Sequence, residues 1–250
     1  MNKKYCIANW KMNFTLHECK KYIDQWNDMD VSDDKVMTVI CPPYTLLHLF
    51  ANFLKNNTDY GAQNIFYENQ GAFTGEISAL MLKNLGCKWV IVGHSERRNI
   101  LNESNEMINK KIINLLSEGL NPILCVGEKK EERLRGDTSS VINEQLSIAF
   151  KNIDLCFNNL MIIAYEPVWA IGSGLNAEYD QIKEVHSQIR NFINKKGLKN
   201  KNISIIYGGS VTMENAENLS RIDNVDGFLI GGASLEVESY YNIYNKLQES

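Results

Sequence analysis

The sequence has no long apolar run, no closely paired cysteines and no excess of charge of one sign. No apolar segment could span a bilayer, and no signal-peptide pattern precedes the first strand-like run. The six cysteines are widely spaced without a C-x-x-C pair, which argues against a zinc site and a disulfide framework. A net charge of −4 gives no basis for binding nucleic acid or an anionic membrane. We therefore expect a cytoplasmic protein with free thiols and no bound metal.

Eight short apolar runs punctuate the 250 residues, and each is followed by a helical pattern. The runs are continuous rather than alternating, so both faces of each strand are expected to be buried, as in a parallel sheet. Eight such units in about 250 residues predict one α/β domain over residues 1–250, a (β/α)8 barrel with eight parallel strands. An open doubly wound sheet is the alternative, but no G-x-G-x-x-G follows the first strand. The strands are expected at residues 5–8, 36–41, 60–63, 89–92, 122–126, 160–165, 203–207 and 227–230.

Apolar residues between these runs recur every three or four positions, which predicts helices that each bury one face. The first helix is expected to bury Leu16, Cys19, Ile23 and Trp26. A long polar loop is expected over residues 64–76. The remaining helices are expected at residues 46–54, through 81–85, 104–118, 142–150, 182–193, 214–219 and 240–247, with a charged helical segment after the fifth strand.

Glu166 follows the expected sixth strand directly and precedes a proline. Pro167 restrains Glu166 to an extended conformation, so the strand is expected to end there. A glutamate at the mouth of a buried strand loses hydration, which suits it to act as a general base. The residues that follow are apolar through Ile171 and then glycine-rich, with Gly172 and Gly174, and they read as a lid or as an ordinary surface loop.

Other polar residues also stand where strands are expected to end. Asn9 and Lys11 follow the first strand, His94 the fourth, and Ser210 the seventh. Each has an ordinary explanation: a solvated lysine, a structural histidine, a serine that caps a turn. In a barrel, however, all these ends lie on the face where barrel enzymes place their active sites. Their convergence favours a site over four separate coincidences.

Two glycine-rich segments, Gly208-Gly209-Ser210 and Gly231-Gly232, are each expected to lead into a helix. Backbone N–H groups at such helix starts bind anions, and with Gly172 they could surround one phosphate. We therefore expect a small phosphorylated substrate, from which Glu166 removes a proton. His94 and Lys11 would stabilise the oxyanion that forms. A base, an imidazole and a cation together can abstract a proton next to a carbonyl without a metal or cofactor.

The chain closely resembles the triosephosphate isomerase family over its whole length, with matching motifs from Asn9 to Leu235. Several long motifs occur in the family's order, which makes the resemblance highly specific. The matching blocks are Asn9-Trp10-Lys11-Met12-Asn13, Gly71-Ala72-Phe73-Thr74-Gly75-Glu76, Gly93-His94-Ser95-Glu96-Arg97-Arg98, Cys125-Val126-Gly127-Glu128, Tyr165-Glu166-Pro167-Val168-Trp169-Ala170-Ile171-Gly172, Tyr207-Gly208-Gly209-Ser210-Val211 and Gly231-Gly232-Ala233-Ser234-Leu235.

The resemblance implies interconversion of dihydroxyacetone phosphate and D-glyceraldehyde 3-phosphate through an enediol(ate), in glycolysis and gluconeogenesis. Glu166 would shuttle the proton, and an uncharged His94 at the start of a helix near Ser95 would be the electrophile. Lys11 and Asn9 would bind and orient the substrate oxygens. The residues that would hold the phosphate are Gly172, Ser210, Gly231 and Gly232.

The resemblance also implies supporting residues and a partner. Glu96 would pair with Lys11, and Ile171 and Leu229 would press on Glu166 when the lid closes. Thr74 lies in a loop that would reach the neighbouring subunit of a homodimer. Cys125, at the end of the fifth strand, is expected to be a structural, unreactive thiol.

Two segments depart from the family pattern. At the end of the lid, Ser173 and Leu175 stand where threonine and lysine are common, and after the eighth strand Glu236-Val237 stands where Lys-Pro is common. The alternatives that remain are an isomerase or lyase of a larger sugar phosphate and a non-catalytic phosphate-binding barrel, because a fold alone does not fix a function.

Overall fold

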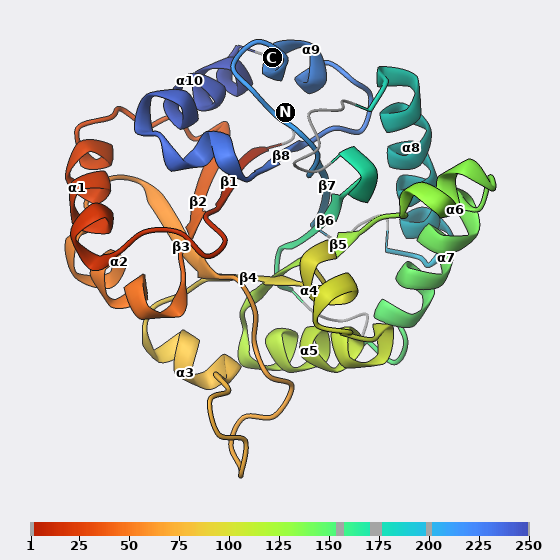
Figure 1. Ribbon diagram of the computed structural model, residues 1–250, viewed down its shortest axis with the longest axis horizontal. Coiled ribbons are helices and arrows are strands. Elements are labelled where there is room, and N and C mark those ends of the chain that lie inside the picture. Colours follow the sequence, from red (N-terminus) through yellow and green to blue (C-terminus); the bar gives the residue numbers. More distant parts are fainter. Residues whose placement is uncertain (1–2, 154–157, 171–176, 199–201, 250) are drawn as a thin grey trace.

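The computed structural model describes residues 3–153, 158–170, 177–198 and 202–249. Within these ranges, parallel strands pair in chain order and close into a barrel, with helices around the outside (Figure 1). Ala8 of the first strand aligns with Ile40 on one side and Ile230 on the other, which closes the sheet. The strands are β1 Lys4–Asn9, β2 Val36–Cys41, β3 Thr58–Ala62, β4 Trp89–Val92, β5 Asn121–Val126, β6 Met161–Tyr165, β7 Ile203–Tyr207 and β8 Gly227–Ile230.

Alternate residues of each strand enter two separate cores. In β1, Tyr5 and Ile7 point into the barrel interior, whereas Cys6 and Ala8 pack outward against the helices. Both faces are therefore apolar, which is why the strands read as continuous apolar runs. The interior core contains Tyr5, Ile7, Val39, Cys41, Trp89, Ile91, Ile123, Cys125, Ile162, Ala164, Ile206 and Leu229.

The helices of the described residues follow the expected order. They are α1 Leu16–Asn27, α2 Leu47–Phe53, α3 Ala79–Asn84, α4 Ser95–Ile100, α5 Asn105–Glu118, α6 Lys130–Leu134, α7 Thr138–Ala149, α8 Tyr179–Lys195, α9 Ala216–Ser220 and α10 Val237–Gln248. Short 3-10 turns occur at Tyr44–Leu46, Val168–Ala170 and Gly232–Leu235. Among these helices, none combines the length and apolarity that crossing a bilayer requires.

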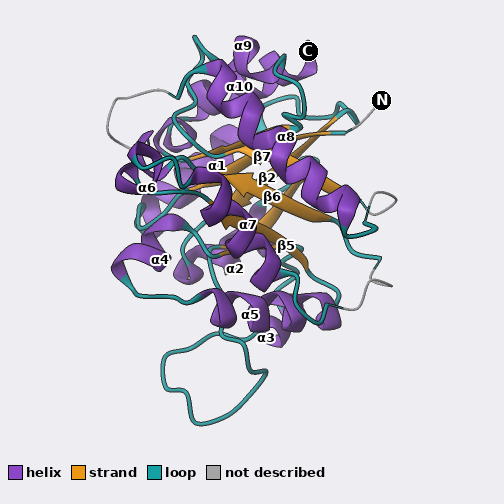
Figure 2. Ribbon diagram, turned by 90° about the vertical axis from the view of Figure 1, so that its right-hand side faces the viewer, coloured by secondary structure: helices purple, strands orange, loops and turns teal. Residues whose placement is uncertain are grey.

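The (β/α)8 barrel predicted from the sequence is confirmed, with small corrections. Leu16, expected on the buried face of α1, is 50% exposed because it is the first helical residue after the Thr15 cap. Tyr22 is buried in that face instead. β3 begins two residues earlier than predicted, at Thr58. The expected polar loop between β3 and α3 projects away from the barrel (Figure 2).

Candidate active site

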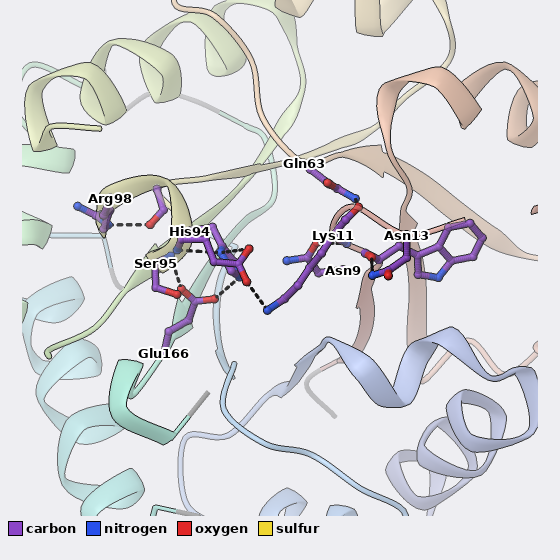
Figure 3. Close-up of polar contacts among 11 residues, drawn as sticks. Asn9, Lys11, Asn13, Gln63, His94, Ser95, Arg98 and Glu166 are labelled. Carbon is purple, nitrogen blue, oxygen red and sulfur yellow. Dashed lines mark hydrogen bonds and ion pairs between the residues drawn. The ribbon is translucent and has the colours of Figure 1, made fainter. Parts of the chain in front are cut away.

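Glu166 lies at the carboxyl end of β6, as predicted, and its side chain is buried. Its backbone N–H donates to the carbonyl of Val126 at 2.8 Å, so the chain leaves β6 close beside the end of β5. A Cβ on Gly127 would lie 1.7 Å from the Glu166 carbonyl oxygen, so only glycine allows this approach. The carboxylate has two neighbours (Figure 3): Oε2 accepts from the Ser95 N–H at 2.9 Å, and Oε1 lies 3.0 Å from His94 Nε2.

His94 is the N-cap residue of α4, so the helix predicted to begin near Ser95 is confirmed. Its Nδ1 accepts a hydrogen bond from the backbone N–H of Glu96 at 3.2 Å. An imidazole nitrogen that accepts a hydrogen bond carries no proton, which leaves the proton of the neutral ring on Nε2. Because Nε2 is the atom that faces Glu166, the ring presents its N–H donor toward the carboxylate.

Lys11 lies across the site from Glu166, and its backbone adopts a φ of 54°, which is uncommon for a residue with a side chain. Its N–H donates to Asn9 Oδ1 at 3.1 Å, and Gln63 Nε2 donates to its carbonyl at 2.8 Å (Figure 3). Lys11 Nζ lies 2.5 Å from Glu96 Oε1, the pair that the family resemblance implies. These contacts hold the strained backbone in place and keep a cation at the rim.

A cavity of about 270 Å³ lies between these groups at the carboxyl end of the barrel. A cavity of this size holds a small ligand, and its wall combines charged side chains with glycine backbone. It is lined by Asn9, Lys11, His94, Glu166, Gly208, Gly209, Ser210, Val211, Thr212, Leu229, Gly231, Gly232 and Ala233.

The glycines on this wall differ in what a side chain at each position would meet. A Cβ on Gly209 would lie 2.2 Å from Tyr207 Oη, whereas one on Gly232 would meet nothing within 4 Å. Gly232 begins a 3-10 turn, as expected for an anion-binding segment. The helix expected after Ser210, from about residue 214, begins at Ala216, two residues later. A loop intervenes because Asn215 Nδ2 donates to the Ser210 carbonyl and folds the chain back.

The other predicted residues lie in different surroundings. Leu229 and Cys125 are buried in the barrel interior, and Leu229 also lines the cavity. Burial raises the pKa of the Cys125 thiol well above its usual range, which fits an unreactive cysteine. Thr74 lies in the projecting loop and is not among the residues that line this cavity. Ile171 and Gly172 lie outside the described residues.

Two residues with clear positions, Glu128 and Gln63, were not predicted as site residues. Glu128, fully buried, accepts from Tyr165 Oη at 3.2 Å, Trp169 Nε1 at 2.9 Å and Arg133 Nη1 at 3.1 Å. Glu128 therefore connects the turn after Glu166, through Trp169, to the segment that follows β5, through Arg133. The sequence signal was available, since a lone glutamate follows an apolar strand and a glycine in Cys125-Val126-Gly127-Glu128. Gln63, which follows β3, carried no comparable signal.

Comparison with known proteins agrees with this geometry. The family described as "Triosephosphate isomerase" matches residues 4–247 of the chain. The triosephosphate isomerase of Aquifex aeolicus is 46% identical over 96% of this chain and 98% of its own length. Those of Dictyoglomus thermophilum and Finegoldia magna are 44% and 42% identical, over 97% and 98% of this chain and 99% of each relative. The chain therefore belongs to the triosephosphate isomerase family.

Proposed function

We propose that this protein interconverts dihydroxyacetone phosphate and D-glyceraldehyde 3-phosphate through an enediol(ate), in glycolysis and gluconeogenesis. The observation that carries the proposal is the meeting of Glu166, His94 and Lys11 around one small cavity whose wall also includes glycine backbone. A base, an N–H donor and a cation are the set that proton abstraction beside a carbonyl requires. The glycine wall supplies the place for the phosphate.

In the proposed reaction, Glu166 removes a proton from the carbon next to the carbonyl. The electron pair of that C–H bond forms the carbon–carbon double bond, and the carbonyl oxygen takes up the negative charge. His94 Nε2–H and the Lys11 ammonium stabilise this charge, while Asn9 orients the oxygens. The proton of the neighbouring hydroxyl then passes to this charged oxygen, so the oxygen that lost it becomes the new carbonyl. Glu166, whose proton can exchange with solvent, delivers a proton to the carbon that carried the old carbonyl, which completes the isomerisation without a cofactor.

The resting geometry indicates one movement in this cycle. The 3.0 Å contact between Glu166 Oε1 and His94 Nε2 leaves no room for a substrate atom between them. The carboxylate must therefore turn away from His94 and from the Ser95 N–H when substrate enters. We propose that Leu229, on the cavity wall, and Ile171, in the lid, exclude water from the carboxylate. The loss of hydration would make the carboxylate a stronger base.

The phosphate is proposed to bind the backbone at Gly172, Ser210, Gly231 and Gly232. Ser210 Oγ donates to the carbonyl of Ala170 at 2.9 Å, which links the loop after β7 to the first residues of the lid. We therefore propose that the lid, as it closes over bound phosphate, keeps its contact with Ser210. An enediolate whose phosphate is bound and from which water is excluded is less free to expel that phosphate.

The test is isomerase activity on glyceraldehyde 3-phosphate, coupled to reduction of the ketone product, for wild type and Glu166→Asp. Aspartate keeps the charge but withdraws the carboxylate by one methylene. We expect an active wild type and a kcat about a hundredfold lower in the variant, since misplacing a catalytic group by about 1 Å costs that much. Glu178→Asp, an exposed change at the start of α8, is the matched control and is expected to keep wild-type kcat. An inactive wild type would reject the proposal.

We further propose that the protein acts as a homodimer in the cytoplasm. Large apolar side chains are exposed in the projecting loop, in the loop after β1 and at the end of α4: Phe73 is 41%, Met12 95% and Ile100 71% accessible. Exposed apolar surface of this kind is typical of protein–protein contacts. Thr74, which lies in the projecting loop, would reach the partner's site beside its Lys11 and His94. The small triose phosphate substrate remains the only other partner that we propose.

A further inference from the structure

Three groups of the site depend on one short helix. α4 has only six residues, yet His94 caps it, the Ser95 N–H holds the Glu166 carboxylate, and Glu96 pairs with Lys11. A helix this short has little stability of its own. Its orientation must therefore be fixed by contacts with the rest of the barrel.

Arg98 makes those contacts with all parts of its guanidinium. Nε donates to the carbonyl of Gly93 at 2.6 Å, Nη2 to the carbonyl of Cys125 at 2.9 Å, and Nη1 to Asn105 Oδ1 at 2.5 Å. Figure 3 shows Arg98 on the same short helix as Ser95. The three acceptors belong to the residue before His94, to β5 and to the start of α5.

The turn that aims His94 packs directly on this guanidinium. Gly93 has a φ of 69°, and a Cβ there would lie 2.9 Å from Arg98 Nη2 and 2.9 Å from Ile108 Cδ1. Cys125 aligns with Ala164 of β6, two residues before Glu166. Arg98 therefore bridges the backbone next to His94 and the strand beside the one that carries Glu166.

We propose that Arg98 is a positioning residue for the isomerisation, which holds His94 and the Ser95 N–H in register with Glu166. The inference rests on the proposed function. Only a planar guanidinium reaches all three acceptors, since a lysine ammonium is a point charge that would reach one at a time. Loss of Arg98 should therefore misplace the reacting groups and lower kcat more than it weakens substrate binding.

A cavity behind Glu166 makes this role testable by chemical rescue. Its volume is about 370 Å³, and its lining includes Gly93, Ser95, Arg98, Asn105 and Glu166. When the arginine side chain is removed, a guanidinium ion from solution can enter this space and donate to the same acceptors. A simple ammonium ion has the charge but lacks the planar set of donors.

The experiment compares wild type, Arg98→Lys and Arg98→Ala in the coupled isomerase assay. We expect kcat to fall about a hundredfold in both variants, with KM within about threefold of wild type. Guanidinium chloride at tens of millimolar, far below denaturing concentrations, should raise the kcat of Arg98→Ala about tenfold or more. Methylammonium chloride at the same concentration should leave it unchanged.

Arg190 provides a matched control at the opposite end of the barrel. It donates to the Ile203 carbonyl at 3.1 Å and to Asp226 Oδ2 at 2.9 Å, at the starts of β7 and β8. Arg190→Lys and Arg190→Ala should lower the melting temperature but keep wild-type kcat per folded molecule. Size-exclusion chromatography of all variants checks that none has changed its oligomeric state.

The outcomes separate the two proposals. A kcat within about threefold of wild type in folded Arg98 variants, or no recovery with guanidinium, would overturn the positioning role while leaving the proposed function intact. If Arg98→Ala does not fold, the kcat of Arg98→Lys decides by the same threefold limit. An inactive wild type rejects the proposed function, and the positioning role is rejected with it.

Discussion

His186 is a fully buried histidine away from the cavity, on the inner face of α8. Its Nδ1 lies 2.8 Å from the carbonyl of Asn224, so Nδ1 donates, and Nε2 has no hydrogen-bond partner among the described residues. Its ring lies edge-on to Tyr165, in the strand that leads to Glu166. Burial, with a smaller contribution from Arg190, lowers the pKa of His186 from 6.5 to about 4.

This shift predicts how stability depends on pH. Between pH 6.5 and about 4 the unfolded chain binds a proton at His186 that the folded chain does not. Stability is therefore full above about pH 6.5 and falls as the pH falls toward 4, by about 3 kcal/mol at most. Urea unfolding of wild type and His186→Gln across this range measures it, and the variant should lose that part of the slope. His48→Gln, an exposed change on α2, should keep it; a wild-type slope in His186→Gln would contradict the account.

For single residues, the sequence predicts position best where chemically active side chains and strand ends coincide. Asn9, Lys11, His94 and Glu166 were all expected on one face, and all line one cavity. Arg98, which contacts none of them through its side chain, could not be assigned in this way, because its role depends on carbonyl groups from three separate segments. Sequence patterns report side-chain chemistry, whereas backbone acceptors carry no residue-specific signal.

Among the elements, strands were easier to predict than helix ends. The predicted bounds of β2, β4, β7 and β8 agree with the structure because a strand buried on both faces is apolar throughout. Helix starts depend on capping contacts, and α9 begins two residues later than expected. α3 is shorter than its apolar pattern indicates, since Leu85 already lies in the C-cap position.

Capping gives a prediction for α5, the helix whose first residue, Asn105, holds Arg98. Ser104 Oγ accepts from the Met107 N–H at 3.2 Å. Ser104→Ala should lower the free energy of unfolding by about 1 kcal/mol and the melting temperature by about 2–4 °C. Calorimetry measures both values. Ser117→Ala in the last turn of α5, where the hydroxyl donates only to the Asn114 carbonyl, should change stability by less than about 0.5 kcal/mol; equal losses would contradict the capping role.

For the whole molecule, the proposed dimer predicts that activity depends on protein concentration. The β3–α3 loop projects from the barrel (Figure 2), and Phe73 and Met12 leave apolar surface uncovered. We expect a dimer in size-exclusion chromatography, and a specific activity that falls on dilution below its dissociation constant. Phe73→Asp should favour the monomer, while Leu134→Asp, an exposed apolar site on α6, should not. A fully active monomer would refute the proposal.

The division of the chain into domains gives a further prediction. The closed order β1 to β8 joins the first strand to the last, so either half alone would leave both of its outer strands unpaired on one side. We therefore expect residues 1–250 to unfold as one domain, in one transition seen alike by fluorescence and circular dichroism.

The most direct test of proton transfer by Glu166 is solvent deuterium uptake, followed by proton NMR of dihydroxyacetone phosphate turned over in D₂O. We expect deuterium at carbon 2 of glyceraldehyde 3-phosphate and, on longer incubation, at the hydroxymethyl carbon of the ketone. Both should appear about a hundredfold more slowly with Glu166→Asp. Turnover that leaves every carbon free of deuterium, or wild-type uptake by the variant, would contradict proton transfer by Glu166.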